Sequence, residues 1–185
     1  MRYGGLRVFT TQVLIAGLVW GLSAAPRLRA EPPSSSAKGS SCASAEYHQF
    51  DFWVGDWDVF DHDHPGSPVA HAVVRAQLGG CVITEDFKNT PGSEGMSLSA
   101  YDAYRKQWQQ SWVSNRPQVL FLTGHARGAA MTLSGREATA AGSQLVRGTW
   151  AKIDGGGRET AVVSEARGKS WKPWFDLVFR PHAAR

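Results

Sequence analysis

The sequence predicts an all-β fold, an antiparallel β-barrel or barrel-like sheet with a short helical turn before it. From Val54 onward, short runs rich in β-branched and aromatic residues recur at roughly ten-residue spacing, a pattern typical of sandwiches and barrels. Turn-forming residues separate the runs, among them Gly124, Gly135 and Gly142. After Ala30 we find no long apolar stripe with the period of a helix.

The helical turn is expected over Glu46–Trp53, where Tyr47, Phe50 and Trp53 recur at a spacing of three. About ten strands should follow. The expected strands are Gly55–Asp61, Val69–Leu78, Cys81–Lys88, Gly95–Asp102, Gln107–Ser114, Gln118–Thr123, Ala129–Ser134, Leu145–Lys152, Glu159–Glu165 and Trp174–Arg180.

Alternation along these strands predicts which side chains share a face. Trp108, Gln110 and Trp112 should point one way. Glu85 should lie on one face with apolar neighbours on its own strand. On the last strand, the shared faces are Phe175, Leu177 and Phe179 on one side, and Trp174, Asp176, Val178 and Arg180 on the other.

The N-terminus has the order of parts of a secretory signal peptide. Arg2 and Arg7 precede an apolar stretch that ends near Leu22, and small-residue cleavage sites follow at Ala24 or Ala30. We therefore predict a signal peptide over residues 1–30 and an exported protein, periplasmic or secreted. The alternative is an uncleaved N-terminal anchor, but the stretch is too short for a membrane span of about 20 residues and no stop-transfer pattern follows it. We therefore expect cleavage, and no stable membrane insertion once the signal is removed.

The charge balance argues against a nucleic-acid partner. The chain has 20 Lys and Arg against 16 Asp and Glu, and four of the arginines precede residue 31, where there is no acid. The rest is formally neutral and has no basic patch of the kind that nucleic acid requires. Residues 31–45 are rich in Pro, Ser, Ala and Gly, which predicts a flexible lead-in. Residues 46–185 have the length of a single domain.

The chain contains two cysteines, Cys42 and Cys81. In an oxidising compartment such a pair most simply forms one disulfide. The alternative, a redox or metal pair, lacks the close Cys-x-x-Cys spacing.

Histidines and carboxylates offer further candidates for chemistry. His62, Asp63 and His64, with His71 further along the chain, are ligand types that suit Zn²⁺ or Cu²⁺. However, the neighbouring sequence contains Pro and Gly, which predicts a solvent-facing turn. We therefore predict no metal site. Glu85 and Asp102 are the carboxylates to consider for acid–base work, but no His or Lys partner is fixed by spacing, so we assign no catalytic residue.

The stretch from Phe50 to Val59, FDFWVGDWDV, resembles the opening of a group of uncharacterised exported bacterial proteins, the DUF1579-type family. That family is related by fold to the calycins, which include lipocalins, fatty-acid-binding proteins and nitrobindins. The likeness continues through Gly80–Glu85, Gly95–Asp102 and Trp108–Asn115.

The resemblance implies an up-and-down, lipocalin-like barrel. By that analogy Trp57 plugs the closed end of the barrel and Arg180 packs over its indole as a cation–π contact. The chain lacks the Gly- and Tyr-Pro-rich opening of nitrobindins, so we expect no haem and no other cofactor.

Seven tryptophans lie beyond the signal, and they either line a ligand cup or fill the interior of a small barrel. The first alternative predicts an exported binding protein for a small, mostly apolar molecule. Its predicted ligand-binding residues are Glu85, Ser97, Tyr101, Trp108, Gln110 and Trp112.

Two other functions stay open: an enzyme that uses Glu85 in the same cup, and a filled barrel with a structural or interaction role. Two or more titratable groups that converge inside the barrel with displaced pKa values would favour the enzyme. The oligomeric state is not predicted.

Overall fold

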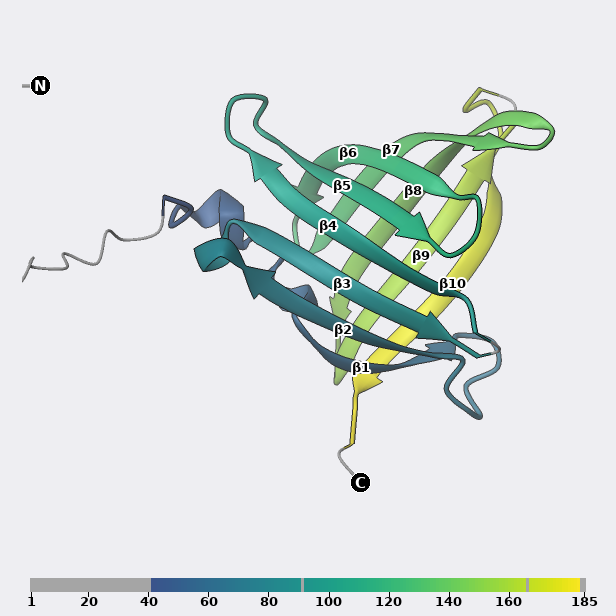
Figure 1. Ribbon diagram of the computed structural model, residues 1–185, viewed down its shortest axis with the longest axis horizontal. Helices are drawn as coiled ribbons and strands as arrows, with labels where there is room; N and C mark the ends of the chain where they lie inside the picture. The colour runs from purple at the N-terminus through teal and green to yellow at the C-terminus, as the bar shows by residue number, and fades with distance from the viewer. Residues whose placement is uncertain (1–40, 91, 166, 184–185) are drawn as a thin grey trace, which may run out of the picture. The chain divides into compact units, whose positions relative to one another are not determined.

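The computed structural model describes residues 41–90, 92–165 and 167–183, and their strands form a closed antiparallel barrel (Figure 1). The predicted all-β, up-and-down barrel is therefore confirmed. The predicted signal peptide, residues 1–30, lies outside the described residues, as does most of the lead-in. Within the described ranges, no helix combines the length and apolarity needed to cross a membrane.

The described residues form ten strands, and each pairs with its neighbours in the chain. They are β1 (Gly55–Asp61), β2 (Ala70–Gln77), β3 (Val82–Asn89), β4 (Glu94–Asp102), β5 (Gln107–Ser114), β6 (Val119–Arg127), β7 (Ala130–Thr139), β8 (Gly142–Ile153), β9 (Gly156–Ser164) and β10 (Lys172–Pro181). The last strand pairs with the first, from Trp57 opposite Pro181 to Asp61 opposite Leu177. Closure gives each of these strands two partners and removes the exposed edges that promote aggregation.

Two glycines that the sequence predicts to lie in turns are instead part of strands β6 and β7. Gly124 lies inside β6 and Gly135 inside β7. A methyl group on Gly124 would collide with the carbonyl oxygen of Thr132, and one on Gly135 with that of Phe121. The two glycines therefore permit a close backbone approach between these strands, which is a second use of glycine that a turn-based interpretation misses.

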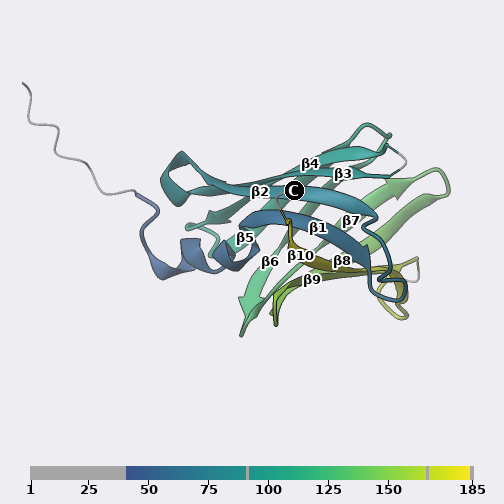
Figure 2. The same cartoon turned by 90° about the horizontal axis from the view of Figure 1, so that it is seen from below.

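Short 3₁₀ helices precede the barrel, η1 (Ala45–His48) and η2 (Asp51–Trp53), and a third, η3 (Leu78–Gly80), joins β2 to β3. Figure 2 shows η1 and η2 at one end of the barrel. The spacing of three that predicted a helical turn fits this helix type, which has three residues per turn. Phe50 and Trp53 are accordingly both buried.

The predicted disulfide is confirmed: Cys42 is bonded to Cys81. Their Cα atoms are 5.1 Å apart. The bond joins the segment before η1 to the residue that precedes β3. It therefore anchors the N-terminal segment at the end of the barrel where η1 and η2 lie.

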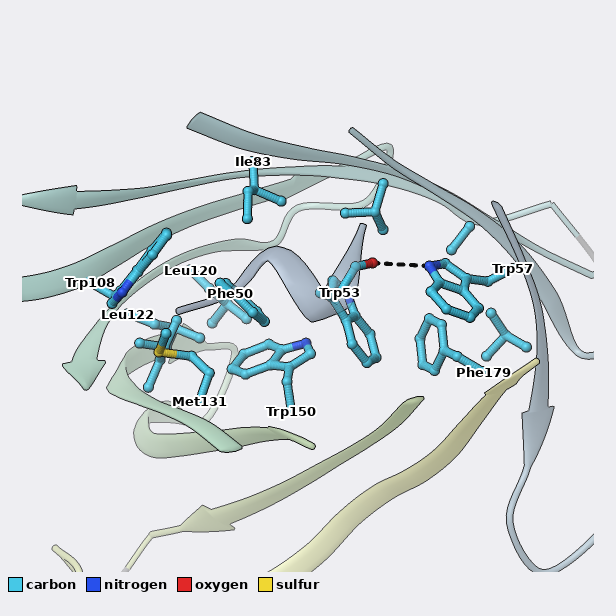
Figure 3. Packing of buried hydrophobic residues seen from close by; sticks show 14 of the residues in the cluster. Phe50, Trp53, Trp57, Ile83, Trp108, Leu120, Leu122, Met131, Trp150 and Phe179 are labelled. Carbon is cyan, nitrogen blue, oxygen red and sulfur yellow. Dashed lines mark hydrogen bonds between the residues drawn. The ribbon is translucent and has the colours of Figure 1, made fainter. Parts of the chain in front are cut away.

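Aromatic side chains fill this end of the barrel (Figure 3). The Phe50 ring lies edge-on to Trp108 and to Trp150, with ring centroids 5.7 Å away in each case. The Trp53 ring packs on Phe179 at 4.4 Å. Trp57 is buried and its indole N–H donates to the Trp53 carbonyl oxygen at 3.0 Å. This half of the barrel is a packed core, and we call it the closed half.

Arg180 does not pack over Trp57 as the lipocalin analogy implied. Its guanidinium lies 4.8 Å from the centroid of the Phe60 ring. The register explains the difference, because Arg180 is opposite Asp58 and Trp57 is opposite Pro181. Since successive residues of a strand point to opposite faces, Arg180 and Phe60 lie on the outer face and Trp57 on the inner one.

Trp174 also departs from the face expected from alternation. The register between β9 and β10 shifts between Pro173 and Phe175, which is a β-bulge. A bulge places one extra residue in a strand and redirects its side chain. As a result Trp174 and Phe175 both line the interior cavity described below, although the remaining alternation to Leu177 and Phe179 is as predicted.

Candidate functional site

The other half of the barrel encloses a cavity of about 330 Å³. Its lining includes residues of the β3–β4 and β5–β6 ends, such as Asn89, Ser93 and Gln118, which lie at the end of the barrel away from η1 and η2. The volume is at the lower end of the range for small-molecule sites, about 300–1,000 Å³. We call this half the open half, and the cavity within it the cup.

The wall of the cup is largely aliphatic and aromatic. Its apolar lining includes Phe87, Trp112, Leu120, Leu122, Val146 and Leu177. The Phe87 and Trp112 rings meet edge to face with centroids 6.0 Å apart. Gly95, the residue opposite Phe87, leaves room for the Trp112 ring, because a methyl group there would overlap the indole.

Two glutamates from different sides of the barrel line the same cup. Glu85 is on β3 and is only 6% exposed. The Ser97 hydroxyl, opposite it on β4, donates to Glu85 Oε2 at 3.2 Å. Glu159 is on β9, opposite Trp150 on β8 and Leu177 on β10. Glu159 as a residue is only half-buried, but its side chain lines the interior.

The cup raises the pKa of both carboxyls. Burial raises the pKa of Glu85 to about 7, while the Ser97 hydroxyl and the Trp53 indole act in the lowering direction. Burial also raises the pKa of Glu159 well above its usual value, and the negative charge of Glu85 raises it further. Because each charge disfavours the other, the two carboxyls ionise together less readily than either would alone.

Two indole N–H groups lie beside these carboxyls without a hydrogen bond of ordinary geometry. Trp53 Nε1 and Trp150 Nε1 are buried and have no hydrogen-bond partner. The Trp53 indole nevertheless lowers the pKa of Glu85, and the Trp150 indole that of Glu159. Each donor is therefore near a carboxyl but outside bonding geometry. A small movement of either side chain, or a bound molecule, would satisfy it.

Amide side chains complete the polar part of the cup. Gln110 lines the cavity and donates to the Ser99 hydroxyl at 3.2 Å. At the rim, Gln118 donates to Glu137 at 2.7 Å and lies 3.4 Å from Trp112 Nε1, whose hydrogen bond it accepts. These contacts hold the Trp112 indole in place at the wall.

The structure separates the predicted ligand-binding residues into two groups. Glu85, Gln110 and Trp112 line the cup, and Ser97 is buried beside Glu85 on the neighbouring strand.

Trp108 and Tyr101 are in the closed half instead. Trp108 is 1% exposed and donates to Gln49 at 3.1 Å, and Tyr101 packs against Tyr47 and Trp108. Trp108 and Trp112 share the inner face, but four residues of strand separate them by about 13 Å. Alternation along the strand therefore predicted correctly that both side chains face the interior, but it could not show that they lie at different levels of the barrel.

Glu159 was not among the predicted site residues. The signal that could have found it is the one that singled out Glu85, namely a glutamate in phase with apolar neighbours. Ala161 and Val163 alternate with Glu159 on the inner face, and both are packed inside.

The remaining carboxylate candidate, Asp102, serves the β4–β5 turn. It accepts hydrogen bonds from the backbone N–H groups of Tyr104 and Arg105, each at 3.0 Å, and pairs with the Arg105 side chain. It does not line the cup.

The histidines considered for a metal clip lie in two separate places. His62 and His64 are exposed and hydrogen-bond to Asp63 and Asp61 in the β1–β2 turn. His71 instead lies 2.6 Å from Asp56, with the His182 ring 4.9 Å from its own.

The carboxylate of Asp56 and the nitrogens of His71 and His182 lie within 4.8 Å of one another, so they have the donor types of a metal site. His182 also lies 2.8 Å from Asp58, and both histidine–aspartate contacts are outside the cup. In this structure the cluster ties the C-terminal end of β10 to β1 and β2.

Comparison with known proteins adds no assignment: no protein-family model matches the chain, and no curated protein matches it.

Proposed function

We propose that this protein is an exported, calycin-like barrel of the DUF1579 type that binds a small, mostly apolar molecule in its cup. The observation that carries the proposal is the division of the barrel interior. One half is packed with aromatic side chains, whereas the other encloses about 330 Å³ behind an aliphatic and aromatic wall.

The contrast between the two halves supports binding over a purely structural role. Protein interiors are normally packed as densely as organic crystals, and a void forfeits dispersion contacts along its lining. The chain has large side chains available to fill space, since it buries Trp53, Trp57, Trp108 and Trp150. A cup of this size next to such a core is what a binding site requires.

The disulfide supports export. Disulfides form and persist in secreted and periplasmic proteins and are uncommon in the cytosol. The Cys42–Cys81 bond thus agrees with the compartment that the N-terminal residues predict.

The test is a titration of the mature protein with 1-octanol, followed by tryptophan emission. Since Trp112 lines the cup, we expect saturable quenching or a shift of the emission. Trp112→Ala should weaken binding by about a hundredfold, because the lost indole contact is worth roughly 2–3 kcal/mol. Its β-type circular dichroism should stay unchanged, since the ring borders a void.

Trp57→Ala is the matched control. It removes a buried tryptophan from the closed half and should destabilise the fold by roughly 3–5 kcal/mol. Octanol binding by the fraction that stays folded should be unchanged. If Trp112→Ala unfolds the domain and octanol binds to neither the wild-type protein nor the control, the interior holds no ligand and the proposal is wrong.

A second candidate function is an acid–base enzyme that uses the same cup. Glu85 and Glu159 favour it, because two carboxyls with raised pKa values that converge in one cavity are a feature of catalytic sites. In the described cup lining, Glu85 and Glu159 are the groups suited to proton transfer. The two functions can be separated with the small molecule that co-purifies from the native host, identified by mass spectrometry before and after incubation with the protein. A binding protein returns it unchanged, whereas an enzyme converts it and loses the conversion in Glu85→Gln.

A further inference from the structure

We propose that the cup selects a small apolar molecule that carries a positively charged head group, such as a protonated amine, and holds that head between Glu85 and Glu159. The inference rests on the proposed function and specifies the chemical class of its ligand.

The first argument is the charge of the lining. The described residues that line the cup include Glu85 and Glu159 but no Lys, Arg or His. Buried carboxylates are ordinarily paired with a cation or with several hydrogen-bond donors. Here Glu85 has one side-chain donor within bonding distance, Ser97. Among the described residues, neither glutamate takes part in an ion pair.

Nearby arginines are engaged elsewhere, so they do not supply the missing charge. Arg158, next to Glu159 in sequence, pairs with Asp176. Arg75 pairs with Asp86, which is next to Glu85. Since adjacent residues on a strand face opposite sides, these two ion pairs lie outside the barrel. The two interior glutamates are thus left without a cationic partner among the described residues.

The surrounding groups suit a cation better than an anion. The indole N–H groups of Trp53 and Trp150 could donate to an anion, but each lies beside a glutamate whose ionised form would repel it. The aromatic rings of Phe87 and Trp112 also form part of the wall, and ring faces attract cations. The apolar remainder of the wall accommodates a hydrocarbon tail.

The proposal implies that binding displaces protons. The acidic groups around the pair are few. Asp86 faces outward to Arg75, and Glu137 is at the rim, where Gln118 and Gln144 donate to it. An amine that enters between Glu85 and Glu159 favours their ionised forms, so its affinity should rise with pH. A neutral alcohol with the same tail has no such coupling.

The experiment compares octylammonium, 1-octanol and octanoate by tryptophan emission and calorimetry between about pH 5 and pH 8, a range in which an alkylamine stays protonated. At the upper pH we expect octylammonium to bind at least about tenfold more tightly than octanol, and its affinity to fall by about tenfold or more toward the lower pH. Octanoate should be the weakest of the three at the upper pH.

Glu85→Gln and Glu159→Gln should abolish the preference for the amine while octanol binding persists. Glu165→Gln, which changes an exposed glutamate, is the control and should leave the preference intact. The pH dependence of the wild-type protein tests the inference even if a variant fails to fold.

Three outcomes separate the two proposals. Tighter, pH-dependent amine binding that both glutamine variants abolish supports the inference. Binding of octanol and octanoate as tight as that of octylammonium overturns the inference and leaves the proposed function standing. Failure of all three compounds to bind overturns the proposed function together with the inference.

Discussion

Glu85 shows how a single residue connects the sequence pattern to the chemistry of this barrel. Alternation puts it in phase with Ile83 and Phe87, and the structure accordingly buries it in the cup. A carboxyl in such a place either loses its charge or acquires a partner. With one hydroxyl donor from Ser97, Glu85 has a pKa raised to about 7.

This raised pKa predicts how stability depends on pH. Between about pH 4.5 and pH 7 the folded protein keeps a proton on Glu85 that the unfolded chain has lost, so stability should fall as the pH rises. The loss across that window is on the order of 3 kcal/mol at 1.36 kcal/mol per unit. Glu159 changes stability in the same direction, because its pKa is raised too.

Glu85→Gln should flatten this dependence. The amide cannot ionise, and Glu159 no longer meets a second negative charge. Urea unfolding at a series of pH values measures the effect, with Glu165→Gln as the exposed control. Equal slopes for the wild-type protein and Glu85→Gln would show that Glu85 is ionised in the fold throughout.

At the scale of elements, the N-terminal segment decides which half of the barrel is filled. Phe50, the residue before η2, and Trp53, the last residue of η2, enter the closed half and pack against side chains of β5, β8 and β10. Space for them comes partly from Gly157 of β9, where a methyl group would meet the Trp53 ring at 2.5 Å. The Cys42–Cys81 bond holds this segment to the barrel.

Removal of the disulfide should therefore loosen the closed end. The bond closes a loop with a sequence separation of 39, and its loss in a Cys42→Ser, Cys81→Ser double variant should cost about 4 kcal/mol on the loop-entropy model. Hydrogen exchange should accelerate first in residues 45–53. Denaturant unfolding of the oxidised wild-type protein against the double variant measures the cost, and an unchanged midpoint would mean that packing alone retains the segment.

The whole molecule combines a packed half with a hollow half inside one closed sheet. The packed half and the unbroken strand pairing supply stability, and the cup leaves part of the interior without contacts. A ligand that binds only the folded state should contact this part of the interior, and by mass action it should raise the free energy of unfolding.

We therefore expect thermal stabilisation by cup ligands. At a hundredfold excess over its dissociation constant, a ligand adds about 2.7 kcal/mol. For a domain of this size this corresponds to a rise of several degrees, on the order of 5–15 °C, in the melting temperature. Scanning calorimetry with octylammonium measures the shift, and Trp112→Ala should reduce it at the same ligand concentration. A melting temperature independent of octylammonium would contradict binding of this ligand in the cup.

The sequence by itself determined the features that depend on neighbours along the chain. Strand positions, the helical turn and the inner faces follow from local propensity and from the two-residue period of a strand. The choice of Cys42 and Cys81 as partners followed from there being only two cysteines. Alternation put Glu85 in phase with Ile83 and Phe87, and Trp112 in phase with Trp108 and Gln110; the resemblance to calycin barrels implied that the two faces share an interior.

Only the tertiary structure decided which inward residues meet. Glu85 and Glu159 face one cup because the sheet closes into a barrel with a particular stagger of its strands, which no local pattern records. The same stagger, with the inserted N-terminal segment, puts Trp108 in the core and Trp112 at the cup. The bulge that brings Trp174 to the border of the cavity, where it stays partly exposed, is likewise invisible to alternation. Alternation reports the face of a residue, whereas its level along the barrel depends on register between strands that are distant in sequence.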